Sequence, residues 1–576
     1  MRAPHAMLVT TAFAALATVT LSRPAPAAPA QSTQFAQRCQ ALASSSAVAP
    51  AHILAATYHP SGTPFSQPAF PGMAPVAIPM PAHCEVTVRA QEHTGVDGRD
   101  YAISIRVRLP ESWNHRFLMQ GGGGTNGVVG DALGMTSFGQ PAALDRGFVV
   151  MAQDSGHDNA RIFDPTRGGL TAFGHDPQAR ADYGGQSLPV ATRAAKALVR
   201  TLYGAAPARS YFVGCSKGGQ EGMMLAQRYP ALYDGIVAAA PGMSLPRAAI
   251  AEMWNTRAIA GITAVGRTAT VSDLASAFSP AQLDQVRSAV LDACDALDGA
   301  RDGIVADHRA CTTARVLPQL RARQCGASGG PACLSTPQID ALVRIHDGAR
   351  DSRGHQIYPG FPWDAGWSDA GWRIWTMGSA DGKVPALNVA MGAASLASIF
   401  STPPQPIGAA PQDGLDFAMR FDFDRDPAGI YRTGGGFVRS GWQDIGARSS
   451  NLAAFSARHG KLIVPHGVSD PVFSLNDTLA WWQEVDAANH GRAAAFARVF
   501  PVPGMGHCMG GPATDRYDAL GALVAWVERG KAPDALPATA GPTSPWPGRA
   551  MPVCRYPLVA RTRTDRNGHS TTTCQS

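Results

Sequence analysis

The segment 211–219 constrains the fold of this chain more than any other. Its sequence is Tyr-Phe-Val-Gly-Cys-Ser-Lys-Gly-Gly, so an apolar, β-prone run leads into a G-x-S-x-G motif centred on Ser216. A helical run from Gln220 to Tyr229 follows and ends at Pro230. A serine on so sharp a turn is strained, and only small neighbours let strand and helix pass closely. The pattern predicts a nucleophile elbow with an exposed Ser216 hydroxyl. The alternative is a glycine-rich turn in which the serine is incidental.

Length and charge limit the classes of protein that this chain can be. At 576 residues it is long enough for two or more domains, or for one large domain with an insertion. Hydrophobic residues make up 45% and charged residues 16%, an ordinary globular balance. The formal net charge of +6 is small for this size and no run of Lys and Arg stands out, so we expect no nucleic acid partner.

The N-terminus has the features of a secretory signal peptide over residues 1–30. Arg2 supplies a short basic region, and the apolar stretch Met7–Leu21 is too short to span a bilayer. Ala28-Pro29-Ala30 resembles a signal-peptidase site. No later stretch is long and apolar enough for a membrane span, so we expect a periplasmic or secreted protein without a stable membrane anchor.

Ten cysteines suit an oxidising compartment, and their even number indicates disulfides. Cys39 and Cys84 are expected to tie a Pro- and Ala-rich arm, residues 31–84, to the body. No C-x-x-C pair supports a zinc site. Spacing alone leaves the connectivity open, although it favours local pairing within three couples: Cys294 and Cys311, Cys325 and Cys333, Cys554 and Cys574.

Strands alternate with helices in the first part of the chain, which predicts a parallel sheet with right-handed crossovers. Residues 31–84 show little periodicity. Period-two alternation of apolar and polar residues predicts antiparallel strands at 85–89 and 101–109. Apolar runs and helical periodicity predict the remaining elements: strands at 116–119, 147–153 and 235–240, and a helix at 186–203.

The alternation stops at about Met243 and returns at Lys461. The intervening segment is helical, rich in tryptophan and full of loops, and such insertions usually form lids over a site. An independent second domain is the alternative, but no linker signature marks its ends. Beyond the insertion we expect strands at 461–465 and 498–502, and helices at 478–488 and 518–530.

A serine nucleophile needs a base, and the base needs an orienting acid. Asp470 follows the strand at 461–465, and His507 follows the last strand, so both are expected at the carboxyl edge of the sheet beside Ser216. Three rivals are weighed against this assignment. His466 would place acid and base on one loop, Asp477 suits a helix cap, and Asp515 breaks the order serine, acid, histidine.

An oxyanion hole needs two N–H groups. Lys217, directly after the nucleophile, supplies one from its backbone, and Gly122 or Gly123 in the run Gly121–Gly124 supplies the other; we assign Gly123. The alternatives for this run are a flexible linker or a phosphate loop. The chain has no G-x-x-x-x-G-K-[ST] motif and no helix-opening G-x-G-x-x-G, so we expect no organic cofactor.

Two cysteines connect the elbow to the base. Cys215 precedes Ser216, and Cys508 follows His507. If the three catalytic residues meet, these thiols are brought close and can form a disulfide in an oxidising compartment. The alternative is a pair of buried free thiols.

These motifs resemble those of the tannase and feruloyl esterase family. The resemblance covers nearly the whole mature chain and is strongest at 214–219, 466–473 and 502–534, while Phe421–Asp424 also matches. It implies an α/β-hydrolase core with a large, mainly helical lid domain inserted after the strand that follows the nucleophile elbow. The expected organisation is a signal peptide at 1–30, a core at 31–242 and 449–576, and a lid at 243–448.

The resemblance also implies five disulfides and a structural calcium ion in the lid. The pairs are Cys39–Cys84, Cys215–Cys508, Cys294–Cys311, Cys325–Cys333 and Cys554–Cys574. The calcium ligands are the carboxylates of Asp295, Asp298 and Asp302 and the carbonyl groups of Ala300 and Ile304. Three carboxylates in one glycine-containing loop suit a hard cation, although without the family an Asp-rich turn is an equal explanation.

The activity implied is that of a secreted serine esterase that cleaves esters of feruloyl, galloyl or hydroxybenzoyl type, with Trp375 and Phe473 lining the pocket. Hydrolysis of the mono(2-hydroxyethyl) ester of terephthalic acid is the alternative. Members of the family with that activity carry an acidic residue directly after the serine and an arginine in the lid. This chain has Lys217 there, and Lys383 is the only cation between Gly378 and Phe400. A non-catalytic binding protein and a peptidase on the same scaffold are the other classes considered.

Overall fold

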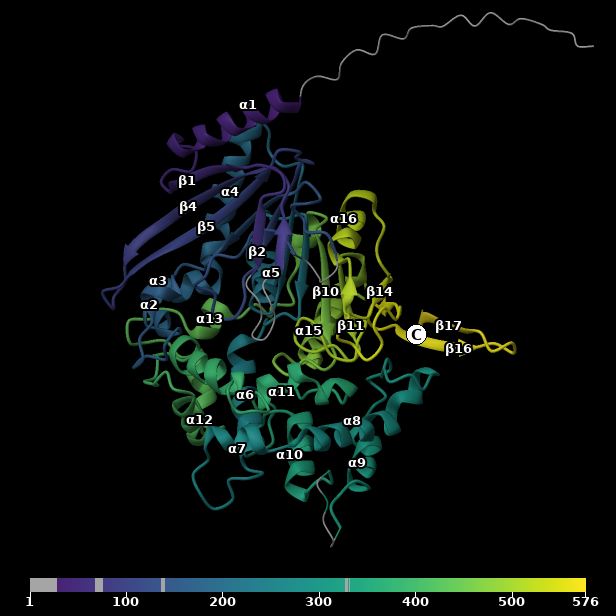
Figure 1. Cartoon of the computed structure of the whole chain (residues 1–576). Coiled ribbons are helices and arrows are strands. Elements are labelled where there is room, and N and C mark those ends of the chain that lie inside the picture. The colour runs from purple at the N-terminus through teal and green to yellow at the C-terminus, as the bar shows by residue number, and fades with distance from the viewer. Residues whose placement is uncertain (1–27, 68–75, 136–139, 327–329, 331) are drawn as a thin grey trace, which may run out of the picture.

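A nine-stranded mixed sheet organises the molecule (Figure 1). The computed structural model describes residues 28–67, 76–135, 140–326, 330 and 332–576. The predicted signal peptide therefore lies almost wholly outside the described residues. The strands stand in the spatial order β1 (His52–His59), β4 (His83–Thr94), β5 (Asp100–Pro110), β7 (Val149–Gln153), β6 (Arg116–Gln120), β8 (Arg209–Cys215), β9 (Gly235–Ala239), β10 (Lys461–Gly467) and β11 (Ala497–Val502).

The sheet is antiparallel from β1 to β7 and parallel from β7 to β11. In β4 buried side chains alternate with less buried ones, as the period-two pattern predicted. In β7, by contrast, all five residues are buried, because helices cover both faces of a parallel sheet. This is why the parallel strands have continuous apolar sequences rather than alternating ones.

Helices cover both faces of the parallel half. Phe212 and its neighbours on one face pack with α1 (Ala28–Ala41), α4 (Ser187–Tyr203), α5 (Lys217–Arg228) and α15 (Leu475–Ala488). Tyr211 and Val213 point to the other face, where they pack with α16 (Ala519–Arg529). The alternation along β8 thus joins two hydrophobic cores through one strand.

The helical insertion lies between β9 and β10, which pair with each other in parallel. Figure 1 shows its helices gathered at one end of the sheet. Trp363, Trp367 and Trp372 stack in its core. Its elements include α6 (Leu245–Ala260), α7 (Val271–Ser276), α8 (Pro280–Cys294), η4 (Asp295–Asp298), α9 (Thr313–Arg321), α10 (Thr336–Asp347), η5 (Ala365–Ser368), α11 (Ala370–Thr376), η6 (Asn388–Ala393), η7 (Leu396–Phe400), α12 (Pro411–Arg420), η8 (Asp426–Tyr431) and α13 (Gly441–Ile445).

Shorter elements complete the fold. Two-stranded pairs form between β2 (Pro64–Gln67) and β3 (Val76–Pro79), β12 (Arg516–Tyr517) and β14 (Ala538–Thr539), β13 (Ala535–Leu536) and β15 (Val553–Cys554), and β16 (Val559–Thr564) and β17 (Ser570–Gln575). Short helices are η1 (Leu42–Ser44), α2 (Asn159–Ile162), η2 (Ala172–His175), α3 (Pro177–Ala181), η3 (Asp182–Gln186), α14 (Ala453–Ala457) and η9 (Ala493–Ala495). The pair β16 and β17 projects from the body as a hairpin (Figure 1).

The N-terminal arm is more ordered than its sequence suggested. Residues 31–84 contain part of α1, the strand β1 and the pair β2 and β3. The lack of clear periodicity was misleading, because β1 is an edge strand with mostly part-exposed side chains and so needs no apolar alternation. Cys39 bonds to Cys84 and fixes α1 to β4, as predicted.

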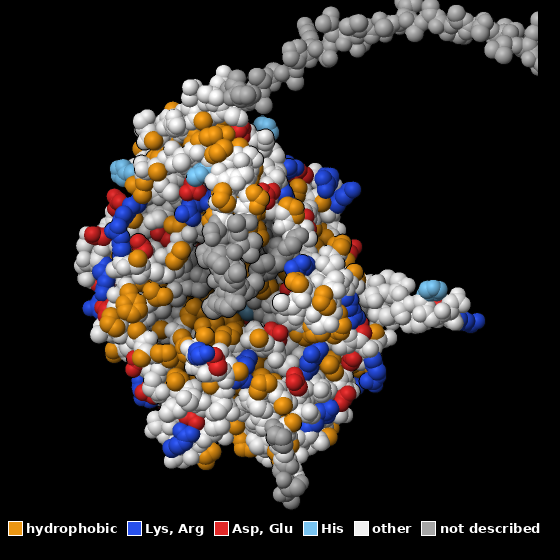
Figure 2. All heavy atoms as spheres, in the orientation of Figure 1, with side chains coloured by type: hydrophobic (Ala, Val, Ile, Leu, Met, Phe, Trp, Pro, Cys, Tyr) orange, Lys and Arg blue, Asp and Glu red, His pale blue; other side chains and the backbone are white. Residues whose placement is uncertain are grey.

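All five expected disulfides form in the structure. None of the described helices is long and apolar enough to cross a bilayer. On the face shown in Figure 2, basic and acidic side chains are intermixed rather than gathered in a patch of one sign.

A buried ion pair joins the core to the end of the insertion. Arg180 on α3 and Asp444 on α13 are almost fully buried, with a nitrogen–oxygen distance of 2.9 Å. Arg180 also donates to Thr402 Oγ1 and to the carbonyl of Arg439, and it lies 4.0 Å from the ring centre of Phe437. The guanidinium of Arg180 therefore donates several hydrogen bonds from the core to the helical insertion.

Loss of this ion pair should destabilise the whole chain. Arg180→Ala leaves the Asp444 carboxylate buried with Arg439 as its remaining partner, so we expect the free energy of unfolding to fall by about 3–5 kcal/mol. Arg161→Ala is the control, because Arg161 and its partner Asp158 are both exposed, and it should change stability by less than ~0.5 kcal/mol. Urea denaturation measures both variants, and equal midpoints would refute the role of the buried pair.

Candidate active site

Ser216 sits on the strained turn that its sequence predicted. β8 ends at Cys215, α5 begins at Lys217, and Ser216 between them has φ 65° and ψ −121°. A Cβ added to Gly214 would lie 2.7 Å from the backbone of Gly218, so the turn closes only with glycine there. Because Ser216 caps α5, its hydroxyl stands where the first N–H groups of the helix have no intrahelical acceptor.

Ser216, His507 and Asp470 meet in one hydrogen-bonded chain. His507 Nε2 lies 2.8 Å from Ser216 Oγ, and His507 Nδ1 lies 2.8 Å from Asp470 Oδ2. Asp470 follows β10 and His507 follows β11, so adjacent parallel strands deliver acid and base to the same edge. The arrangement allows His507 to take the Ser216 proton while Asp470 holds the Nδ1 proton.

The Asp470 carboxylate is fully buried and strongly stabilised in its charged form. Burial alone would raise its pKa, but the adjacent His507 and hydrogen bonds from His466 and His507 outweigh burial and hold the pKa below its ordinary range. The N–H groups of Val472 and Phe473 donate to the other carboxylate oxygen, Oδ1. Asp470 therefore stays ionised and keeps a fixed orientation toward His507.

The three rivals have other partners. His466 is buried and contacts Thr478 Oγ1 and the carbonyl of Phe473, with Asp470 3.4 Å from its Nε2. Asp477 pairs with Arg448; it does not cap α15, whose N-cap is Ser474, so the predicted cap was wrong by one turn. Asp515 accepts hydrogen bonds from the backbone of Gly510 and Gly541.

Cys215 and Cys508 form a disulfide with a Cα–Cα distance of 6.0 Å. It links the residue before the serine to the residue after the histidine, across 293 positions of sequence. Trp375 and Phe473 meet the His507 ring edge-on at 5.4 and 5.3 Å between ring centres. The base is thus held by a covalent link on one side and by two aromatic rings.

Glu221, which the sequence analysis missed, ties the glycine run to the elbow. Its buried carboxylate accepts hydrogen bonds from the N–H of Gly122, the side chains of Asn126 and Ser155, and Lys217 Nζ. Gly122 is therefore already engaged, while a Cβ added to Gly123 would meet open space. The engaged N–H of Gly122 is consistent with Gly123 as the second oxyanion donor, an assignment that stays a prediction. The signal for Glu221 was its i,i+4 spacing from Lys217.

The Lys217 side chain is buried rather than free to contact charged ligands. Its ammonium group pairs with Glu221 at 3.1 Å and lies 4.5 Å from the ring centre of Tyr183. Burial lowers the pKa of Lys217, an effect that Glu221 partly offsets. Lys383 is exposed and pairs with Asp381. Lys217 lines the pocket and Lys383 does not.

A small pocket opens beside Ser216. Trp375 and Phe473 line it, as expected, together with residues of α6 and η6. We call this space the acyl pocket. Most of its wall is apolar or aromatic, which suits a planar ring.

A second missed residue, Asp364, joins the insertion to both catalytic loops. It is fully buried and accepts hydrogen bonds from Ser469 Oγ and from the N–H groups of Gly504 and Ala365. Burial raises its pKa to about 6. Ser469 precedes Asp470, and Gly504 lies on the His507 loop, so the insertion helps to position acid and base.

The expected calcium ligands lie on one acidic loop, in which Arg549 pairs with Asp302. Asp295 accepts from the N–H groups of Asp302 and Gly303, and Asp298 accepts from those of Ala300 and Ala306. Burial raises the pKa of Asp298 to about 6, and the charges of Asp302 and Asp295 add to the effect. Mutually repelling carboxylates that are fixed by backbone bonds fit a hard cation.

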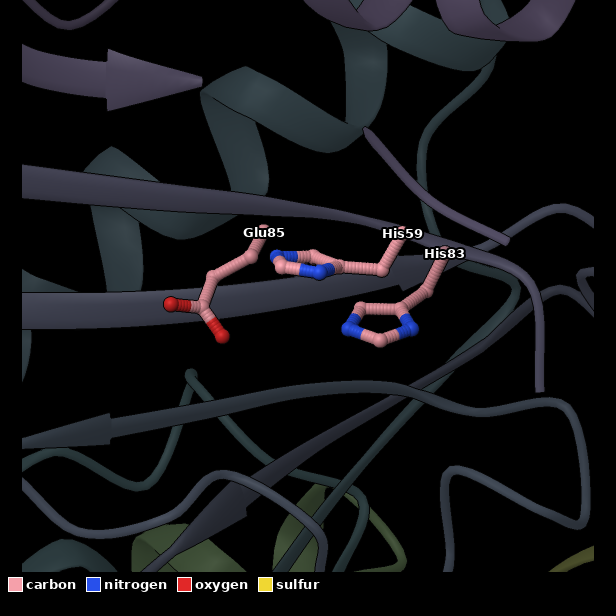
Figure 3. Close-up of side chains that lie close together, drawn as sticks. All are labelled: His59, His83 and Glu85. Carbon is pink, nitrogen blue, oxygen red and sulfur yellow. The ribbon is translucent and has the colours of Figure 1, made fainter. Parts of the chain in front are cut away.

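Figure 3 shows another cluster, formed by His59, His83 and Glu85, whose ligand atoms lie within 4.8 Å of one another. Arg108 lies 2.9 Å from Glu85 and 3.3 Å from His83 Nε2. This guanidinium supplies the positive charge that a metal ion would supply. We therefore assign no metal to the cluster.

Comparisons with known proteins agree with this geometry. The family model of tannase and feruloyl esterase matches residues 84–575. A mono(2-hydroxyethyl) terephthalate hydrolase from Piscinibacter sakaiensis is 45% identical over 504 residues, which cover 84% of this chain and 83% of that protein. Feruloyl esterase B from Aspergillus oryzae has a TM-score of 0.70 at 21% identity, over 94% of this chain and 100% of that one. Tannin acyl hydrolase from Aspergillus niger has a TM-score of 0.65 at 21% identity, over 94% of each chain.

The Cys215–Cys508 disulfide should support the chemistry as well as the fold. In the variant Cys215→Ala/Cys508→Ala we expect a lower melting temperature, since losing a disulfide costs about 2–5 kcal/mol. We also expect slower labelling of Ser216 by a fluorophosphonate, because the base is less well held. The control Cys554→Ala/Cys574→Ala removes the link between β15 and β17 and should leave the labelling rate unchanged. Equal labelling rates in the two variants would contradict the positioning role.

Proposed function

Because the chain belongs to the tannase and feruloyl esterase family of carboxylic ester hydrolases, we propose that it cleaves esters of aromatic acids through an acyl-enzyme on Ser216. The observation that carries the proposal is the continuous contact from Asp470 through His507 to the Ser216 hydroxyl. The aromatic wall of the acyl pocket supports the aromatic character of the acid.

In the proposed mechanism His507 removes the proton of Ser216, whose oxygen attacks the ester carbonyl. Asp470 keeps the Nδ1 proton of His507 in place and stabilises the imidazolium that forms. The imidazolium then protonates the departing alcohol. In the second half, His507 activates water, which hydrolyses the acyl-enzyme and regenerates Ser216.

The tetrahedral oxyanion is proposed to bind the N–H groups of Lys217 and Gly123. Each such donor typically contributes roughly 3–4 kcal/mol to transition-state stabilisation. Glu221 supports this role, because it holds the neighbouring Gly122 and the Lys217 side chain in one hydrogen-bonded group. Trp375 and Phe473 are proposed to hold the acyl ring against the site.

Hydrolysis of a terephthalate monoester is the second candidate. The 45% identity to the Piscinibacter sakaiensis hydrolase favours it. Against it, the lid segment Gly378–Phe400 has Lys383 as its only cation, and Lys383 is on the surface and paired with Asp381. We therefore rank esters of phenolic acids above terephthalate monoesters.

We also propose that the protein is exported to the periplasm or secreted. Five disulfides link parts of the chain as distant as Cys215 and Cys508, and such bonds persist in oxidising compartments. The signal-like N-terminus predicted from the sequence agrees with a periplasmic or secreted enzyme. The proposed partner is a small aromatic ester.

A calcium ion is proposed to stabilise the lid. The carboxylates of Asp295, Asp298 and Asp302 and the carbonyl groups of Ala300 and Ile304 would hold it. Arg549 pairs with Asp302 and donates to its carbonyl, so the loop is also fastened to the C-terminal part of the chain. The ion would neutralise the acidic loop and take no part in ester cleavage.

Turnover of p-nitrophenyl acetate and methyl ferulate tests the assignment of the catalytic residues. Ser216→Ala should lose at least about 10³-fold in kcat/KM, and Asp470→Asn a comparable factor, because each residue acts through the same proton transfer. The matched control Asp515→Asn removes the rival carboxylate and should stay within about threefold of wild type. Equal turnover by Ser216→Ala and wild type would point to another nucleophile, and an inert wild type in oxidising, calcium-containing buffer would support a binding protein.

Calcium removal should lower thermal stability. Chelation is expected to reduce the melting temperature of the wild-type protein, since calcium at a hundred times its Kd contributes about 2.7 kcal/mol. Asp298→Asn should start from a lower melting temperature and respond little to the chelator. Differential scanning fluorimetry measures both, and a wild-type melting temperature that chelation leaves unchanged would exclude the structural ion.

A further inference from the structure

A carboxyl group is built into the wall of the acyl pocket. Leu245, Ala249 and Glu252 follow one another at i, i+4 and i+7 along α6, and all three line the pocket beside Ser216. Glu252 is only 5% exposed. The carboxyl lies against Gly392, where any side chain would collide with Glu252 Oε2. The glycine therefore makes room for the acid.

The Glu252 carboxyl lacks a partner that would explain its burial. Glu252 Oε2 is buried and has no hydrogen-bond partner among the described residues. A buried polar group without a partner typically costs about 1–3 kcal/mol. The ammonium group of Lys217, which also lines the pocket, is already paired with Glu221. Because Glu252 lines the pocket beside Ser216, a bound acyl group can supply this partner.

The charge state of Glu252 narrows the kind of ligand. Burial, followed by the nearby negative charge of Asp470, raises the pKa of Glu252 to about 8. At neutral pH the group is then mostly a neutral carboxylic acid, which can both donate and accept a hydrogen bond. A ring hydroxyl matches this group well. A ring carboxylate would bring a second negative charge near Asp470, and among the described residues that line the pocket Lys217 is the only cation.

We propose that Glu252 is a specificity-determining residue, whose carboxyl hydrogen-bonds a hydroxyl group on the aromatic ring of the acyl group and disfavours rings that carry a carboxylate. The inference rests on the proposed esterase function and deepens it by naming the residue that distinguishes a ring hydroxyl from a ring carboxylate. Glu252 takes no part in the proton transfers of Ser216 and His507. Its effect is confined to the choice of acyl group.

The test compares kcat/KM for three methyl esters, those of benzoic acid, 4-hydroxybenzoic acid and 3-hydroxybenzoic acid, and for monomethyl terephthalate. The wild-type enzyme should prefer the better of the two hydroxybenzoates over benzoate by about tenfold or more, the effect of one hydrogen bond in a desolvated site. Monomethyl terephthalate should be slower than benzoate. A wild-type enzyme that cleaves benzoate and hydroxybenzoates equally well would overturn the proposal without any variant.

Substitutions then assign the preference to Glu252. Glu252→Ala should reduce the hydroxybenzoate-to-benzoate ratio to near one while benzoate is still cleaved, and Glu252→Gln, which can donate and accept, should keep most of the ratio. Thr256→Val is the matched control. Thr256 lies one turn further along α6 and is buried, its Oγ1 has no hydrogen-bond partner among the described residues, and it does not line the pocket. The hydroxybenzoate-to-benzoate ratio of this variant should therefore equal that of the wild type. An unchanged ratio in Glu252→Ala would refute the role of Glu252. If the wild-type enzyme cleaved none of the four esters and also left p-nitrophenyl acetate uncleaved, the result would instead refute the proposed function.

Discussion

The backbone of Ser216 is the constraint on which the site depends. A non-glycine residue at φ 65° and ψ −121° costs about 1–3 kcal/mol, and it persists only where its surroundings determine it. Here a buried strand and a buried helix fix both ends of the turn. Gly121, the first residue of the glycine run 121–124, packs against Gly214 and Gly218, so three backbones meet where no side chain fits. The strain at Ser216 and this close approach have one cause, because both bring the glycine run Gly121–Gly124 next to Ser216.

Buried polar groups then connect this turn to segments that are far away in sequence. Glu221 accepts hydrogen bonds from Gly122 and Lys217, and Asp364 accepts hydrogen bonds from the loops that carry Asp470 and His507. Each carboxylate is buried, so a missing partner would cost far more than in water. The disulfide between Cys215 and Cys508 adds a covalent link between the Ser216 turn and the His507 loop. Asp364 belongs to the insertion, so the insertion helps to fix the loops that carry Asp470 and His507.

Much of this could be predicted from the sequence, and the remainder has a physical reason. Ser216, Asp470 and His507 could be predicted because the order of strands, turns and helices places them at one edge of the sheet. The pairing of Cys215 with Cys508 could then be predicted, because these cysteines are adjacent to Ser216 and His507. The expected strands and helices formed within a few residues of their predicted bounds, since apolar runs in parallel strands are a strong local signal. The order in the arm 31–84 was missed because an exposed edge strand gives little such signal.

Glu221, Asp364 and Glu252 were missed because a buried carboxylate is distinguished by its partners in three dimensions, which the sequence does not show. The side chain of Lys217 shows the same limit: the sequence gives a lysine beside Ser216, and only the structure shows that Glu221 pairs with it.

The buried carboxyl groups of Asp364, Glu221 and Glu252 differ in their hydrogen-bond partners, and this difference separates a structural role from a role in substrate recognition. Asp364 and Glu221 have several donors each, so their burial is accounted for within the fold. Glu252 is equally enclosed, yet its Oε2 has no donor among the described residues and it lines the space where an acyl group must sit. A carboxyl that served the fold alone would be expected to have partners from the fold, because an apolar residue of similar size would otherwise be more stable in its place. We therefore propose that the substrate supplies the missing partner of Glu252. Burial and the nearby charge of Asp470 raise the pKa of Glu252, and a carboxyl group that resists ionisation favours a ring hydroxyl over a ring carboxylate.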